Sequence, residues 1–262
     1  MTNTGGTPAD RVNPDVAELL MRSVDEIRGD MLHKGKAKIV YSTAIEDVLL
    51  MEFMDDATAF DGTKKGTITS KGFYNSHISA SVMRHLEKCG VSTHFLGQLD
   101  DRYHLVRHLE MIPVEAVIRN IAAGSLSRRL GFDEGTKLDR PILEFFYKDD
   151  DLGDPWLNRY HIRAMDVCTD EELTTIEEDA WRINAMLRDF FADSDLVLID
   201  FKLEFGRESD GSLVLGDEVS PDTCRLWDAS TGHRMDKDRF RLDLGDVENA
   251  YQEVHRRIAW EE

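Results

Sequence analysis

The stretch LVLIDFKLEF, from Leu196 to Phe205, combines a core element with ionisable groups. Alternate side chains of a β-strand point to opposite faces. One face would carry only the apolar side chains of Val197, Ile199, Phe201, Leu203 and Phe205. The other face would begin with Leu196 and Leu198 and continue with Asp200, Lys202 and Glu204. The pattern predicts a buried strand with three ionisable groups aligned along one side.

A hairpin is predicted directly after this strand. Asp210-Gly211 is a strong two-residue turn signal, and a type I′ turn centred on it places Glu204 directly opposite Asp217. Opposed like charges destabilise a sheet unless a cation lies between them, and Mg²⁺ binds carboxylates together with phosphate oxygens. We therefore predict a metal–nucleotide site on the hairpin. An exposed hairpin with solvated charges is the alternative, and a slip of register would weaken the pairing.

The surrounding patterns indicate an α+β chain. AKIVYST from Ala37, VLLMEFM from Val48 and VEAVI from Val114 are typical of strands. Helices are expected over residues 16–27, 75–89, 126–130 and 247–258. Thr169 and Glu172 form a capping box for a further helix. Its apolar stripe consists of Leu173, Ile176, Ala180, Ile183, Leu187 and Phe190.

The chain is expected to divide near residues 109–113, where one run of strands ends and Pro113 precedes the next. We predict an N-terminal extension of residues 1–30, an N-terminal α+β lobe of residues 31–110 and a C-terminal α+β lobe of residues 111–262. The small, polar residues 1–12 are expected to form a mobile tail.

Composition excludes several classes of function. A formal net charge of −19 argues against sequence-independent nucleic-acid binding. No apolar run approaches the roughly 20 residues that cross a bilayer, and MTNTGGTPAD lacks the pattern of a signal peptide, so no membrane association and a cytoplasmic location are expected. Cys89, Cys168 and Cys224 are predicted to be reduced. The acidity fits either a solvated surface or a salty cytoplasm.

Two groups of basic and polar residues are candidate anion sites. Lys36 and Lys38 alternate with apolar residues, so both ammonium groups can face a polyphosphate, although a solvated edge strand is an equal alternative. Arg119, Ser125 and Arg225 suit a sugar phosphate, because arginine binds phosphate bidentately and Ser125 lies where a helix begins. A surface salt bridge is the alternative for each arginine alone.

Six motifs in order resemble the SAICAR synthetase family, phosphoribosylaminoimidazole-succinocarboxamide synthases. They are GKAKIVY from Gly35, DDATAFDGTKKG from Asp55, PVEAVIRNIAAGSLSRRLG from Pro113, LIDFKLEFG from Leu198, GDEVSPDTCRLWD from Gly216 and MDKDRFR from Met235. The resemblance covers about residues 33–260. It implies a two-lobed α+β fold related to ATP-grasp and kinase-like architectures, with the nucleotide cleft between the lobes.

The resemblance implies ATP and Mg²⁺ as cofactors, with the adenine at the hinge. The implied ATP-binding residues are Lys36, Lys38, Glu110, Met111, Lys148, Glu204 and Asp217. The implied metal ligands are Glu204, Asp217 and Asp154. The implied substrate-binding residues are Arg119, Ser125, Arg225, Arg241, Asp61 and Gly62. Catalytic roles are implied for Lys202, beside the reacting carboxylate, and for Asp200 and Asp222, between which the base for the amine stays open.

The implied reaction is an ATP-dependent condensation of carboxyaminoimidazole ribotide (CAIR) with L-aspartate through an acyl phosphate, which gives SAICAR, ADP and phosphate in purine biosynthesis. A homo-oligomer is compatible with the resemblance. A small-molecule kinase would use the same phosphate-facing lysines and metal carboxylates but has no need of aspartate. A nucleotide-binding regulatory module is the non-enzymatic alternative, against which the intact Lys36, Lys38, Lys202, Glu204 and Asp217 argue.

Overall fold

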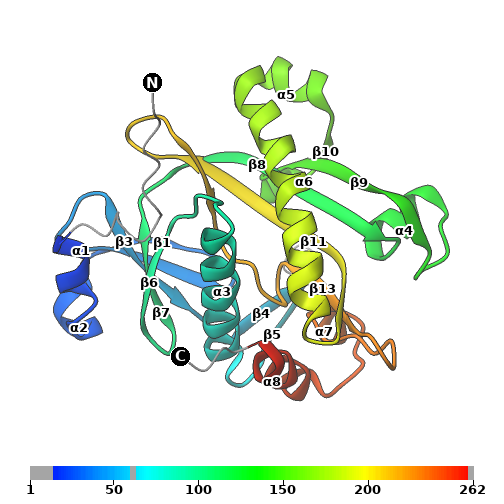
Figure 1. Cartoon of the computed structure of the whole chain (residues 1–262), viewed down its shortest axis with the longest axis horizontal. Helices are drawn as coiled ribbons and strands as arrows, with labels where there is room; N and C mark the ends of the chain where they lie inside the picture. The colour runs from blue at the N-terminus through cyan, green and yellow to red at the C-terminus, as the bar shows by residue number, and fades with distance from the viewer. Residues whose placement is uncertain (1–13, 60–62, 259–262) are drawn as a thin grey trace.

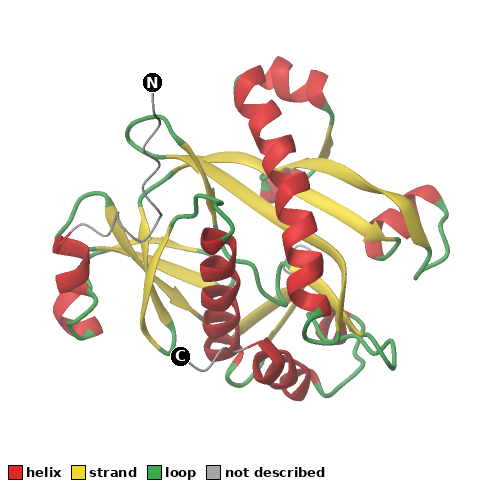
Figure 2. Ribbon diagram, in the orientation of Figure 1, coloured by secondary structure: helices red, strands yellow, loops and turns green. Residues whose placement is uncertain are grey.

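Two antiparallel sheets follow one another along the chain and face each other across its middle (Figures 1 and 2). The computed structural model describes residues 14–59 and 63–258. The first sheet consists, in spatial order, of β1 (Met31–Lys34), β2 (Lys38–Ser42), β3 (Val48–Phe53), β7 (Tyr103–Arg107) and β6 (Phe95–Asp100). A separate hairpin pairs β4 (Asp56–Ala59) with β5 (Lys64–Thr67). The strands predicted in AKIVYST and VLLMEFM are confirmed as β2 and β3.

The second sheet is built around β11 (Leu196–Arg207). Its other strands are β10 (Trp156–Leu157), β9 (Lys137–Tyr147), β8 (Glu110–Ile121), β12 (Leu213–Gly216) and β13 (Cys224–Asp228). One edge of β11 pairs with β8, and its other edge pairs first with β13 and then with β12. Because partners occupy both edges, the predicted buried strand is confirmed.

Two long helices cover the sheets, and shorter helices fill the connections. In Figure 1, α6 (Asp170–Ala192) crosses the second sheet, and α3 (Lys71–Lys88) stands between the sheets with α8 (Val247–Ile258) against its end. The capping box at Thr169 and Glu172 is confirmed, as is the buried stripe of α6. The shorter helices are α1 (Pro14–Leu19), α2 (Val24–Ile27), α4 (Gly124–Leu130), η2 (Asp150–Leu152), α5 (Arg159–Met165) and α7 (Asp238–Arg241).

The predicted faces of β11 are wrong for the first half of the strand. A bulge interrupts the pairing with β13, so that Leu198 pairs with Leu226 but Asp200 pairs with Arg225. The extra residue, Ile199, reverses the alternation. The α6 side therefore receives Leu196, Leu198, Phe201, Leu203 and Phe205. Val197 and Ile199 pack on the opposite side, which further along carries Asp200, Lys202 and Glu204.

The predicted hairpin register is wrong by one residue. Glu208 N–H donates to the Ser212 carbonyl (2.9 Å), which leaves a three-residue loop that ends at Gly211 with φ of 83°. Glu204 consequently pairs with Gly216 rather than with Asp217. Asp217 follows the strand in a left-handed conformation (φ 58°), and its carboxylate nevertheless lies close enough to Glu204 for both to contact Lys202.

The described part of the predicted extension packs on the first sheet. Residues 14–27 form two short helices rather than the single one expected, because the capping box of Ser23 and Glu26 starts a new helix at Val24. Leu19, with neighbouring apolar side chains, packs against the sheet face that contains Leu50. The predicted tail of residues 1–12 lies outside the described residues, and the division into lobes stays a prediction. In the described part of the chain, no helix is long and apolar enough to cross a membrane.

Candidate active site

A cavity of about 1200 Å³ opens between the two sheets. One end of it is apolar, with lining side chains Val40, Leu49, Met51, Val106, Leu109 and Met111. The other end is lined by lysine, arginine and carboxylate groups from β8, β11 and the segment after β12. An apolar slot that leads into a charged end suits a ligand with a flat base and a polyphosphate.

The two predicted hinge residues differ in position. Met111 lines the apolar end, where it packs against Gly206 and Gly216 so closely that a Cβ atom at either glycine would lie 3.1 Å from a Met111 atom. Glu110 does not line the cavity, because its exposed carboxylate pairs with Arg207 (3.1 Å). The predicted place of Glu110 at the hinge beside the nucleotide stays a prediction, with its carboxylate directed to Arg207.

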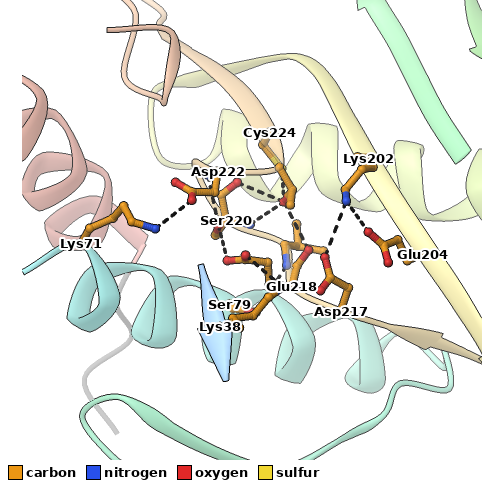
Figure 3. A network of polar contacts seen from close by, with 12 residues as sticks. Lys38, Lys71, Ser79, Lys202, Glu204, Asp217, Glu218, Ser220, Asp222 and Cys224 are labelled. Atoms are coloured by element: carbon orange, nitrogen blue, oxygen red, sulfur yellow. Dashed lines mark hydrogen bonds and ion pairs between the residues drawn. The ribbon is translucent and has the colours of Figure 1, made fainter. Parts of the chain in front are cut away.

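Lysines and carboxylates alternate at the charged end of the cavity. Glu204 is 2% exposed and forms ion pairs with Lys148 and Lys202. Asp217 pairs with Lys38 and lies 3.9 Å from the Lys202 ammonium group. Figure 3 shows Lys202 between Glu204 and Asp217. The predicted proximity of the two carboxylates is thus present, with Lys202 as their shared partner.

Two further carboxylates complete this cluster. Glu115 on β8 accepts from Lys202 Nζ (2.9 Å), and Glu218 Oε1 lies 3.1 Å from Lys38 Nζ. The lysine–carboxylate cluster therefore consists of Lys38, Lys148, Lys202, Glu115, Glu204, Asp217 and Glu218. Four carboxylates face three ammonium groups, so the cluster has one excess negative charge when all seven groups are ionised.

Neighbouring opposite charges favour the ionised forms of Lys38, Lys202, Glu204 and Asp217. Burial acts to raise the pKa of Glu204 and of Asp217, but the neighbouring lysines outweigh it and lower both pKa values. Burial acts to lower the pKa of Lys38, whereas Asp217 and Glu218 raise it above its ordinary value. The pKa of Lys202 is likewise raised by Glu204 and Asp217 against the effect of burial. Fixed charges of both signs are therefore available for a ligand.

Glu204 and Asp217 fit a Mg²⁺ ion that is shared with phosphate oxygens. Mg²⁺ commonly takes one or two carboxylates and completes its octahedron with phosphate and water. Asp154 lines the same cavity, but its Oδ1 accepts from the Asp149 N–H (3.0 Å). Across residues 14–59 and 63–258, no group of three or more His, Cys, Asp or Glu side chains is arranged to hold a metal. Glu204 and Asp217 are therefore the candidate pair, and the role of Asp154 as a metal ligand stays a prediction.

A second charged group is centred on Asp200. Its Oδ2 accepts from Arg119 (2.7 Å) and from Arg225 (2.8 Å), and Arg119 also donates to Ser125 Oγ (3.1 Å). Gly124, with φ of 54°, lets the guanidinium of Arg225 lie against the backbone at the start of α4. The predicted anion-site residues therefore converge on one wall of the cavity.

The remaining predicted residues lie around these two groups. Lys36 lines the cavity and contacts Asp150 (2.6 Å), while Arg241 lines it beside Asp238 (2.7 Å). Asp222 also lines the cavity and is 4% exposed. The predicted substrate-binding residues Asp61 and Gly62 lie outside the described residues.

Several groups that line the cavity or contact its lining residues are not among the residues predicted from the sequence. Glu115 and Glu218 lie within two of the quoted motifs, and Glu218 adjoins Asp217. Alternation along VEAVI and the GDE triplet are therefore available signals. His94 lines the cavity in a neutral form, because burial lowers its pKa to about 4. Lys71 and Tyr251 contact Asp222 from α3 and α8, and no local pattern distinguishes them from ordinary helix residues.

Comparisons with known proteins agree with the motifs. Residues 31–258 match the protein-family model described as SAICAR synthetase. A phosphoribosylaminoimidazole-succinocarboxamide synthase from Clostridium botulinum is 52% identical over 230 residues, which covers 88% of this chain and 98% of that protein.

Solved structures agree as well. The phosphoribosylaminoimidazole-succinocarboxamide synthase from Ehrlichia chaffeensis is 42% identical, with a TM-score of 0.87 over 89% of this chain and 100% of that one. A SAICAR synthetase solved in complex with ADP is 46% identical, with a TM-score of 0.84 over 88% of this chain and 98% of that one.

Proposed function

The chain belongs to the SAICAR synthetase family, and on this basis we propose that it condenses carboxyaminoimidazole ribotide with L-aspartate. ATP is converted to ADP and phosphate, and the product is the succinocarboxamide ribotide of purine biosynthesis. The enzyme is an ATP-dependent carbon–nitrogen ligase. We include a cytoplasmic location in the proposal, because the reaction consumes ATP and free aspartate. A homo-oligomer stays a prediction.

The arrangement of Asp200, Lys202 and Glu204 along β11 is the observation that carries the proposal. Asp200 lies at the end with Arg119 and Arg225, where the phosphate and sugar of a ribotide would bind. Glu204 lies at the end with Lys148 and Asp217, where ATP phosphates and Mg²⁺ would bind. Lys202 lies between the two ends, where an anionic carboxylate would meet the γ-phosphoryl group.

The first chemical step would form an acyl phosphate. A carboxylate oxygen of the ribotide attacks the γ-phosphorus, the bond to ADP breaks, and ADP leaves with its electron pair. Lys202 would neutralise the approaching carboxylate, and Lys36 and Lys38 would hold the phosphates. Mg²⁺, held by Glu204 and Asp217, would supply charge neutralisation on the transferring group.

The second step would form the amide. The deprotonated amine of aspartate attacks the acyl carbon, and phosphate leaves with the former carboxylate oxygen. The amine must lose a proton to react. Asp200 and Asp222 are the two candidate bases named from the sequence. The two arginine contacts of Asp200 favour a ligand-orienting role for it.

An isotope experiment tests both steps. Ribotide labelled with ¹⁸O in its carboxylate is incubated with the protein, Mg²⁺-ATP and aspartate, and products are analysed by mass spectrometry. The proposal predicts the succinocarboxamide ribotide together with phosphate that contains one ¹⁸O atom. Unlabelled phosphate would rule out the acyl phosphate, and a stable phosphorylated ribotide without an amide would identify a kinase.

A further inference from the structure

Resting on the proposed function, we propose that Tyr251 and Lys71 are positioning residues that hold Asp222 as an ionised hydrogen-bond acceptor for an amino group of the substrates. Neither residue lines the cavity, whereas Asp222 does. The two residues would therefore act on the reaction through Asp222 alone. Figure 3 shows Lys71 approaching Asp222 from the side away from Lys202 and Glu204.

Both carboxylate oxygens of Asp222 are fixed by buried donors. The Tyr251 hydroxyl donates to Oδ1 (2.7 Å). Lys71 Nζ donates to Oδ2 at 2.9 Å, and Lys237 Nζ lies 3.4 Å from the same oxygen. The Asp222 N–H also donates to Ser220 Oγ (3.1 Å), so the backbone is held as well as the side chain.

These donors come from separate elements that meet beneath the cavity. Lys71 begins α3, and Tyr251 lies in the middle of α8, which packs on α3. Lys71 is 1% exposed and Tyr251 is 0% exposed. Burying an ammonium group is costly unless a carboxylate compensates for it, and an apolar pair of similar size would serve packing equally well. The geometry thus favours orientation of Asp222 over a purely structural role.

Counting acceptor sites defines what Asp222 can do. An ionised carboxylate offers about four lone-pair sites, and three of them face Tyr251, Lys71 and Lys237. About one site is left for a donor in the cavity. The substrates offer N–H donors on the aminoimidazole ring and on the aspartate amine. The pKa of Asp222, which burial would raise, is held well below its usual range by Lys237 and Lys71. Accepting a hydrogen bond therefore suits Asp222 better than removing a proton.

The test compares Tyr251→Phe with Tyr74→Phe. Both substitutions remove one hydroxyl, and both tyrosines lie at the contact of α3 with α8, where the rings of Tyr74 and His255 are 5.6 Å apart. Only the Tyr251 hydroxyl reaches Asp222. We measure the melting temperature, kcat, and KM for ATP, ribotide and aspartate. Wild-type protein without aspartate-dependent ADP release would refute the proposed function itself, separately from this inference.

For Tyr251→Phe we expect kcat/KM for the ribotide or for aspartate to fall about tenfold or more, because a hydrogen bond to a charged group is lost. A rise confined to the KM for the ribotide would indicate the ring amino group, and a rise confined to aspartate would indicate its amine. KM for ATP should stay within about twofold, and Tyr74→Phe should match wild type. Unchanged kinetics in Tyr251→Phe, or an equal rise in all three KM values with a lower melting temperature, would overturn the inference.

A second pair of variants tests Lys71. Lys71→Arg keeps a cation beside Asp222, whereas Lys71→Met removes it with little change in length. We expect Lys71→Arg to retain more ribotide and aspartate affinity than Lys71→Met in folded protein. Equal kinetics for both variants would contradict a role that depends on charge, and the Tyr251→Phe result stands if Lys71→Met does not fold.

Discussion

The Glu204→Gln variant is expected to lose catalysis while it keeps its fold. The substitution removes one negative charge from the lysine–carboxylate cluster, which then has three carboxylates facing three ammonium groups. The amide of glutamine keeps the shape of the side chain and can still accept a hydrogen bond from Lys202. Lys202 and Lys148 also stay close to the negative charge of Asp217. We therefore expect a change of less than about 2 kcal/mol in the free energy of unfolding, below the 3–5 kcal/mol typical when a buried ion pair loses one partner.

The expected loss of activity is much larger. Glu204 would supply one of two carboxylate ligands to the Mg²⁺ ion, and metal charge contributes several kcal/mol to a phosphoryl-transfer transition state. A loss of about 4 kcal/mol corresponds to roughly a thousandfold in kcat/KM. The assay is the initial rate of ADP release at several Mg²⁺ concentrations, with chemical unfolding measured on the same preparations.

Glu218→Gln is the matched control for this variant. It makes the same chemical change in the same cluster, at a buried residue 3.1 Å from Lys38 that is not a predicted metal ligand. We expect Glu218→Gln to retain far more activity than Glu204→Gln. Near-normal activity in Glu204→Gln, or equal losses in the two variants, would refute the assignment of Glu204 to the metal.

Three further predictions concern stability and reactivity. Glu172→Gln should lower the free energy of unfolding by roughly 2 kcal/mol at pH 7, because hydrogen bonds from Arg207 lower the Glu172 pKa from 4.5 to about 2. The difference from wild type, measured by urea unfolding, should be complete above pH 4.5 and should vanish as the pH falls through 2. A difference that does not change with pH would contradict this cause. Leu19→Ala should lower the free energy of unfolding by about 2–4 kcal/mol and leave kcat unchanged. Leu19 is 5% exposed, and it packs on the face of the first sheet that points away from the cavity. A loss under about 0.5 kcal/mol would show that α1 is loosely attached. A thiol reagent should modify Cys89 rapidly in native protein and all three cysteines in denaturant. Cys168 and Cys224 should react slowly in native protein, because both are buried and burial raises the pKa of both thiols. Rapid modification of a second thiol in native protein would contradict this packing.

Alternation along a strand predicts the charged side of β11 where the strand is regular. From Asp200 to Glu204 the polar residues face the cavity as expected. Before Asp200 the prediction fails, because the bulge at Ile199 depends on pairing with β13, which lies about 25 residues further along the chain. Alternation contains no information about where a partner strand forces an extra residue.

At the hairpin, the predicted strand register is wrong, but the predicted closeness of the Glu204 and Asp217 carboxylates is present. Asp210-Gly211 signals a turn, but a two-residue and a three-residue loop share that signal, and Gly211 supplies the left-handed conformation that ends the longer one. Asp217 adopts φ of 58° just beyond the strand, which compensates for the shift. In that conformation Asp217 contacts Lys38 of β2, and the local sequence does not encode a contact between such distant residues.

Contacts made through helices were the least predictable part of the site. Arg119, Ser125 and Arg225 were identifiable because they lie in long motifs with chemistry typical of an anion site. Lys71 and Tyr251 were not, because each belongs to a helix whose packing partner is distant in sequence. A lysine at the start of a helix is normally solvated, whereas Lys71 is 1% exposed and its ammonium group donates to Asp222, 151 residues further along the chain.

Aspartate-dependent ADP release tests the central claim most directly. Purified protein is given Mg²⁺-ATP and carboxyaminoimidazole ribotide, with and without L-aspartate, and ADP is measured alongside the mass of the ribotide product. The account predicts ADP release that depends on both ribotide and aspartate, in equal amounts with a succinocarboxamide product. ADP release without aspartate and without amide formation, or no turnover under any of these conditions, would contradict it.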